Sequence, residues 1–144
     1  MSRAEREIRE KSQQRIFFQS FDHVWQAIQL SIPYPLAVSD VNQGIIETDW
    51  IDISDGFQPF HGRLDRRPIQ YKLRVLVVRG QYEGESAVRV TIVKPMRIKP
   101  NFLGETRSVE SDGVEEMLIF YRIERELSIA ETIRQEASKE KNQP

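Results

Sequence analysis

Cysteine is absent from this chain of 144 residues, and histidine occurs only twice, as His23 and His61. Without cysteine the chain has no disulfide, no thiolate nucleophile and no cysteine metal ligand. The sequence also lacks the glycine-rich phosphate loops, the Gly-x-Ser-x-Gly nucleophile motif and the His-Glu-x-x-His zinc motif. No set of nucleophile, base and orienting group is recognisable. We therefore expect a protein that is not an enzyme, with no catalytic residue, no cofactor and no metal.

Long apolar runs and an excess of one charge are missing as well. No window of about 18 apolar residues exists, so the sequence predicts no membrane-spanning helix. The 21 basic and 22 acidic side chains leave a net charge of −1. This balance excludes strong global attraction to nucleic acid or to an anionic membrane, so any such contact needs a local patch.

Polar segments at both ends enclose one region with the composition of a folded domain. Residues 1–14 contain a single bulky apolar side chain, Ile8, and predict a flexible arm. Residues 138–144 predict a disordered tail. Residues 15–137 are numerous enough to form one domain with its own core.

Strand patterns dominate the first two thirds of that domain. The segment 15–19 is short and aromatic and predicts a first strand. Ser20 or Asp22 can cap the helix that follows, which ends before Pro33. Four further segments have the composition or alternation of strands: 36–39, 45–52, 71–77 and 88–93. The first two predict a hairpin, and we expect Ile46 and Trp50 on its buried face.

Helical patterns follow. Ser111 and Asp112 predict the start of a helix over residues 113–126, and a capping box of Ser128 and Glu131 predicts a last short helix over 129–137. The apolar arc of the first of these helices is too wide for one contact surface, so a second side should be covered as well. It consists of Val114, Met117, Leu118, Ile119, Phe120, Tyr121, Ile123 and Leu127.

The long irregular segment 53–68 holds the best candidate for a functional surface. Phe57, Phe60, His61 and Arg63 combine two aromatic rings, an imidazole and a guanidinium within seven residues. Loops of this length in compact domains are often functional, and we expect these four residues to contact a partner. The structural alternative is a loop held down by its two phenylalanines.

Two other patterns are weaker. Asp49, Asp52 and Asp55 lack the order of a calcium loop and are expected to be solvated acids at strand ends. Two basic stretches, residues 63–74 and 94–99, lack a nucleic-acid recognition motif. Outward basic side chains also protect sheet edges from aggregation, which is the interpretation we favour.

Three stretches resemble the BamC-type lipoproteins of the outer-membrane β-barrel assembly machinery. They are the helix with Val24-Trp25-Ile28, the strand Gly44-Ile45-Ile46-Glu47-Thr48-Asp49-Trp50, and the arginine-rich entry to the next strand at residues 66–75. The resemblance covers about residues 15–127. It implies a helix-grip fold: α+β, with a curved antiparallel sheet of about five strands packed on a long C-terminal helix and a shorter N-terminal helix.

The resemblance further implies an envelope-associated accessory or scaffold module, and it brings no catalytic residue. Family members carry an export signal and a lipidated cysteine, and this chain has neither. An export signal upstream of Met1 would place the protein in the periplasm at the outer membrane, whereas a complete chain would be cytoplasmic. The partners we expect are other proteins, including outer-membrane assembly components, and not nucleic acid; a membrane would be reached only through a lipid anchor that this sequence lacks.

The alternative function is binding of a small hydrophobic ligand between sheet and helix. It requires a cavity of several hundred Å³. Four large side chains, Trp25, Trp50, Phe120 and Tyr121, are expected to fill that space instead.

Overall fold

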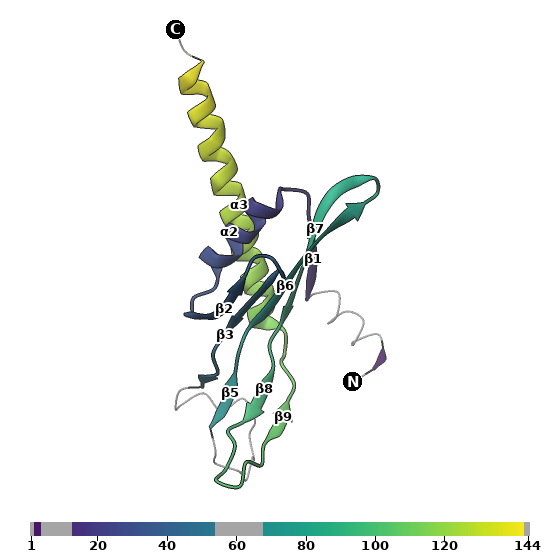
Figure 1. Ribbon diagram of the computed structural model, residues 1–144, viewed down its shortest axis with the longest axis vertical. Helices are drawn as coiled ribbons and strands as arrows, with labels where there is room; N and C mark the ends of the chain where they lie inside the picture. The colour runs from purple at the N-terminus through teal and green to yellow at the C-terminus, as the bar shows by residue number, and fades with distance from the viewer. Residues whose placement is uncertain (1, 4–12, 54–67, 143–144) are drawn as a thin grey trace.

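The computed structural model describes residues 2–3, 13–53 and 68–142, and this part of the chain has the predicted α+β architecture. Two antiparallel sheets, of five and four strands, accompany helix α2 (Phe21–Ser31) and helix α3 (Val114–Lys141) (Figure 1). The shorter N-terminal helix and the long C-terminal helix are thereby confirmed. No helix in the described ranges is both long and apolar enough to cross a membrane.

The five-stranded sheet contains the strands that alternation predicts. Its order is β1-β7-β6-β3-β2, and all neighbours are antiparallel. The bounds are Gln14–Phe17 (β1), Leu36–Asp40 (β2), Ile45–Thr48 (β3), Arg74–Tyr82 (β6) and Glu85–Val93 (β7). Ile46, Val75, Val90 and Ile92 are fully buried on one face, as the alternation predicts.

Strand β1 begins within the arm predicted over residues 1–14. Gln14 pairs with Thr91, and the carbonyl of Gln13 accepts a hydrogen bond from the N–H of Ile92 at 2.9 Å. The sheet therefore continues into the polar segment, because an edge strand needs backbone pairing more than it needs apolar side chains.

Strands β6 and β7 form a longer hairpin than the sequence predicts. They pair from Arg74 and Val93 to Tyr82 and Glu85, which leaves a two-residue loop. Glu83 and Gly84 both have positive φ, at 51° and 81°. This is the backbone shape that matches the twist of a tight hairpin.

The sequence does not predict the second sheet. Its order is β4-β5-β8-β9, with bounds Ile51–Asp52 (β4), Ile69–Tyr71 (β5), Met96–Ile98 (β8) and Arg107–Val109 (β9). Only two or three residues form each strand, and prolines flank β8 on both sides. Proline has no N–H for the ladder, so this region looks like an irregular connection in sequence.

Thr48 divides the strand predicted over residues 45–52. Its Oγ1 accepts a hydrogen bond from Leu73 N–H at 3.0 Å and donates one to the Asp49 carbonyl at 3.0 Å. The chain then leaves β3, so Trp50 does not share the buried face of Ile46. Trp50 is half-buried, and its ring lies against Lys72 and Arg97.

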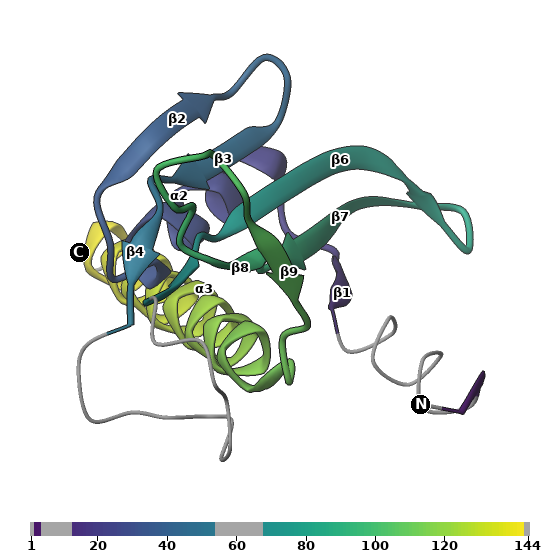
Figure 2. The ribbon, with the colours of Figure 1, turned by 90° about the horizontal axis from the view of Figure 1, so that it is seen from below.

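Both helices lie on the same side of the five-stranded sheet (Figure 2). The side chain of Ser20 caps α2 by accepting from His23 N–H at 3.3 Å, as predicted. One buried cluster joins the two helices to the sheet. It contains Phe17, Phe21, Val24, Trp25, Ala27, Ile28, Ile32, Ile46, Leu73, Val75, Val77, Val88, Val90, Ile92, Ile119, Phe120, Ile123 and Leu127.

Helix α3 is continuous, so the predicted division at Ser128 is wrong. The Ser128 carbonyl accepts from Thr132 Oγ1 at 3.1 Å, four residues along the same helix. No glycine or proline occurs between Val114 and Lys141, so nothing in the backbone stops the helix. Residues 138–141, expected in the disordered tail, are helical, and the C-terminal part of α3 projects beyond the sheet (Figure 1).

Candidate functional site

The four residues expected to contact a partner are Phe57, Phe60, His61 and Arg63. All four lie outside the described residues, so their role stays a prediction.

The acidic patterns form no metal site in the part of the chain that the structure describes. Asp52 Oδ1 accepts from Gln70 Nε2 at 2.7 Å, and its Oδ2 lies 3.9 Å from Lys99 Nζ. Asp49 is exposed. Asp49 and Asp52 are thus the strand-end acids that the spacing predicts, and Asp55 lies outside the described residues.

Basic side chains of the two stretches 63–74 and 94–99 that the structure describes contact other groups of the protein. Lys72 Nζ lies 2.5 Å from Glu47 Oε1, and Arg74 Nε lies 3.5 Å from Glu47 Oε2. The guanidinium of Arg97 lies 3.8 Å from the centre of the Trp50 ring, and Lys72 lies 4.9 Å from it. These two cations compete with any base that would stack on the Trp50 ring.

A cluster of two tyrosines, a glutamate and a lysine ties the start of α3 to the second sheet. The hydroxyl groups of Tyr34 and Tyr71 are 2.7 Å apart, and Tyr34 donates to Glu115 at 3.3 Å. Lys94 Nζ lies 3.9 Å from Glu115 and 4.6 Å from the centre of the Tyr71 ring.

The electrostatics of this cluster favour a structural role. Burial is the main cause that raises the pKa of Tyr34, followed by the hydrogen bond with Tyr71 and the charge of Glu115. Burial also raises the pKa of Tyr71. Both phenols are therefore neutral near pH 7, which makes them hydrogen-bonding groups and poor general bases.

An exposed apolar stripe runs along the outer face of α3. Val114, Met117, Leu118 and Tyr121 follow each other at spacings of three, one and three residues, and 51–65% of each residue is exposed. This spacing places them on one side of two helical turns. We call these four residues the α3 stripe. They belong to the wide apolar arc for which the sequence predicts a second covered side. That prediction is wrong, because this side of α3 is exposed to solvent. Tyr121 in particular is not part of the core.

The face of α3 opposite the stripe is packed in the core, so the stripe always faces away from the sheet. Ile119, Phe120 and Ile123 are buried in the core. At the helix start, Ser111 Oγ lies 2.9 Å from the fully buried carboxylate of Glu116 and accepts from Gly113 N–H at 3.1 Å. A carboxylate is favourable in the first turn of a helix, where the helix dipole is positive.

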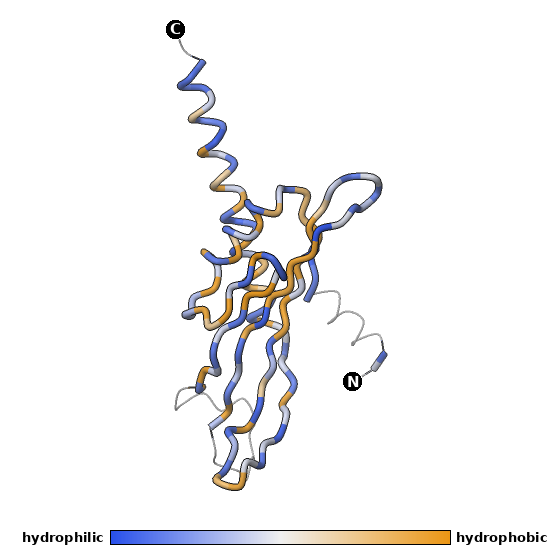
Figure 3. The backbone as a smooth tube through the Cα atoms, viewed as in Figure 1, coloured by the Kyte–Doolittle hydropathy of each residue, from blue (hydrophilic) through white to orange (hydrophobic). Residues whose placement is uncertain are grey.

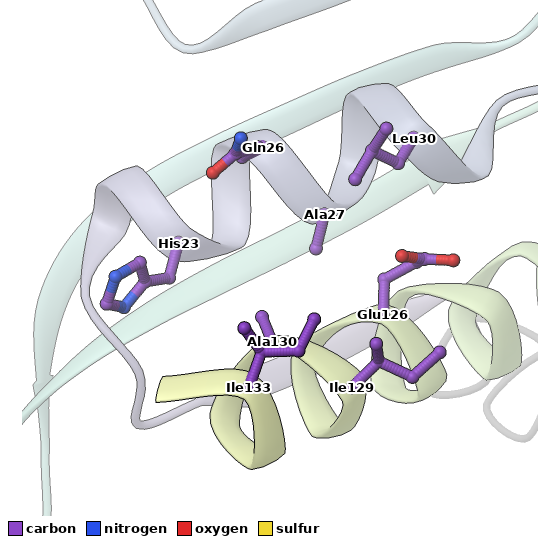
Figure 4. A pocket seen from close by; sticks show the side chains of 8 residues that line it. All are labelled: His23, Gln26, Ala27, Leu30, Glu126, Ile129, Ala130 and Ile133. Carbon is purple, nitrogen blue, oxygen red and sulfur yellow. The ribbon is translucent and has the colours of Figure 1, made fainter. Parts of the chain in front are cut away.

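A shallow groove runs along α2, from His23 in its first turn to Leu30 in its last, and faces the middle of α3 (Figure 4). Its volume is about 180 Å³, and its long side chains Leu30, Ile129 and Ile133 are largely exposed. His23 lines one end, and Glu126 lines the side of α3. The groove is open to solvent and too small to enclose a drug-sized ligand.

No protein-family model matches this chain, and no curated protein matches it with significant similarity. The site is therefore defined by the geometry of α3 and its surroundings.

Proposed function

We propose that this protein is a non-enzymatic protein-interaction module that binds its partner through the α3 stripe. The observation that carries the proposal is the exposure of four large apolar side chains on a helix whose other face is anchored in the core. Contiguous apolar surface of this kind on a soluble domain typically marks a protein contact. A helix face with anchors at this spacing is a common recognition element.

The surroundings of the stripe indicate the chemistry of the partner. Arg122 and Arg125 are exposed at its C-terminal end. A complementary surface would be apolar opposite Leu118 and Tyr121 and acidic opposite the two arginines. The groove between α2 and α3 would extend the contact toward Ile129.

Site-specific photo-crosslinking tests this proposal in cells that express the protein. A photoreactive amino acid at Leu118 should give a crosslink to one defined protein, which mass spectrometry identifies. The purified partner should then bind the wild type and lose at least about tenfold in affinity for Leu118→Glu, because a charge would be buried in the interface. Val78→Glu is the matched control, because Val78 is a similarly exposed apolar residue on β6.

The two arginines allow a second test of the proposal. Arg122→Glu with Arg125→Glu should weaken binding and reduce its dependence on salt, since favourable charge pairs across the rim are lost. Equal affinities for the wild type, Leu118→Glu and Val78→Glu would refute the α3 stripe as the binding surface. A crosslink to a second copy would identify the partner as this chain itself.

The sequence resemblance extends the proposal to a cellular role. We propose an accessory module of outer-membrane protein assembly in the cell envelope, with a helix-grip fold, supported by the helix around Trp25, the Gly44–Trp50 segment and the arginine-rich segment at 66–75. Affinity purification with the assembly machinery tests this role. Recovery of the α3 partner from a different complex would contradict the role and leave the α3 contact intact.

The alternative, a hydrophobic ligand between sheet and helix, has less support. Phe120 and Ile123 of α3 are buried in the same cluster as Val75 and Val90 of the sheet. Protein side chains therefore occupy the layer in which such a ligand would lie.

A further inference from the structure

The turn between β8 and β9 exposes the two most prominent apolar side chains of the second sheet. Phe102 is 95% exposed and Leu103 is 67% exposed. The turn that carries them lies at the end of the described structure opposite the C-terminus of α3, and its backbone is coloured hydrophobic in Figure 3. We call this turn, with Phe102 and Leu103, the β8–β9 tip.

The turn that carries this tip is held by hydrogen bonds. Asn101 Oδ1 accepts from the N–H groups of Leu103 and Glu105, both at 3.0 Å, and the Asn101 carbonyl accepts from Gly104 N–H at 2.9 Å. Gly104 has a φ of 80°, which suits glycine. Thr106 Oγ1 donates to the Ile98 carbonyl at 2.6 Å and closes the hairpin below the turn. The two apolar side chains are therefore presented by an ordered turn.

Basic side chains surround the base of the tip. Residues 97–107 contain Arg97, Lys99 and Arg107 and a single acid, Glu105. A second acid, Asp52 of β4, lies 3.9 Å from Lys99, and Arg97 lies over the ring of Trp50. The Glu105 carboxylate accepts from Asn101 Nδ2 at 3.4 Å. Three cations and two acids leave a local charge of +1, whereas the chain as a whole carries −1.

We propose that the β8–β9 tip inserts Phe102 and Leu103 into the interfacial region of an anionic lipid surface, with Lys99 and Arg107 at the headgroups. Apolar side chains next to lysine and arginine are the combination that binds such surfaces. A protruding tip of two residues can enter a bilayer interface without a shaped partner, whereas a specific protein contact needs a much larger matched area. This inference goes beyond the proposed protein contact, which involves another surface.

The shape of the molecule also predicts how it would be oriented on a membrane. The tip and the C-terminal end of α3 lie at opposite ends of the long axis (Figure 1). A tip bound to lipid would therefore point the end of α3, near Lys139, away from the membrane.

Vesicle sedimentation tests the proposal with the full chain. Vesicles of phosphatidylcholine with phosphatidylglycerol should bind the wild type more strongly than vesicles of phosphatidylcholine alone. The double variant Phe102→Ser/Leu103→Ser should lose at least about tenfold in partitioning, because two large apolar side chains no longer leave water. Leu30→Ser is the matched control, since Leu30 is as exposed as Leu103 but lies on α2. Melting temperatures should be unchanged, as all three residues are exposed.

The absence of cysteine permits a direct measurement of insertion. An environment-sensitive fluorophore on Leu103→Cys should shift to the blue with anionic vesicles, and the same label on Ser138→Cys should not. The proposal is overturned if the wild type does not bind anionic vesicles, if the double variant binds as well as the wild type, or if both labels shift equally. Lys99→Gln with Arg107→Gln should remove most of the preference for phosphatidylglycerol.

Discussion

Gly44 is the most constrained of the described glycines. Its φ is +70°, and a Cβ built on it would lie 2.2 Å from the carbonyl oxygen of Val77. That contact cannot relax easily, because Val77 N–H donates to the Gly44 carbonyl at 2.8 Å. We predict that Gly44→Ala lowers the free energy of unfolding by about 2–4 kcal/mol, through strain and a backbone clash. Urea denaturation measures this change.

Gly84 is the matched control for Gly44. It also has a positive φ, of +81°, but no atom lies within 4 Å of its built Cβ. Gly84→Ala should therefore cost only the backbone strain, about 1–2 kcal/mol. Equal losses in the two variants would show that close packing against β6 is not what requires glycine at position 44.

Tyr34 links stability to high pH. Its pKa is raised by burial, by its bond with Tyr71 and by the charge of Glu115. The folded protein keeps the phenol proton at a pH where the unfolded chain has lost it, so this contribution is complete below about pH 10 and falls as the pH rises further. We predict that Tyr34→Phe costs about 1 kcal/mol at pH 7 through lost hydrogen bonds and shows a shallower loss of stability above pH 10. Denaturant unfolding at pH 8–11 measures both, and parallel pH profiles would contradict the prediction.

At the scale of elements, the sequence predicts what depends on local periodicity. Alternation in β6 and β7 and the apolar face of α2 locate these elements, because their buried side chains repeat along the chain. The second sheet escapes prediction since Ile69 pairs with Ile98, a partner 29 residues away, in strands of only three residues. The signal for this pairing does not lie within either strand.

Helix α3 shows what local sequence patterns can predict and what they cannot. Ser128 and Glu131 have the residue types and spacing of a capping box. However, α3 begins before them and contains no helix-breaking residue, so the helix continues through Ser128. The width of the apolar arc does predict that α3 has two apolar sides. Which side contacts the sheet and which remains exposed depends on tertiary packing, so the α3 stripe could be suspected from the sequence but not located.

The two halves of α3 should contribute unequally to stability. Ile123 is completely buried in the core, whereas Ile133 is 63% exposed beside the groove. We predict that Ile123→Ala lowers the free energy of unfolding by about 2–4 kcal/mol, through lost burial and a cavity. Ile133→Ala should cost less than about 1 kcal/mol. Urea unfolding of the two variants makes the comparison, and a large loss for Ile133→Ala would mean that the projecting half of α3 is packed more firmly than its exposure indicates.

At the scale of the whole molecule, the two sheets are built on shared chain segments. Strand β5 leads into β6 across Lys72 and Leu73, and β7 leads into β8 across Lys94 and Pro95. Leu73 is fully buried, and its N–H donates to Thr48 Oγ1 at the junction. The core of the first sheet therefore holds the second sheet, which has too few residues to be stable alone.

This continuity predicts one cooperative unfolding transition, and the two tryptophans can report on it separately. Trp25 lies in the main core, and Trp50 lies against Lys72 and Arg97 beside the second sheet. In Trp25→Phe, the fluorescence of Trp50 and the far-UV circular dichroism should have the same urea midpoint. In Trp50→Phe, the fluorescence of Trp25 should likewise have the same urea midpoint as the far-UV circular dichroism. An earlier loss of the Trp50 signal would mean that the second sheet opens independently, and the β8–β9 tip would then sit on a mobile unit instead of a rigid extension of the core.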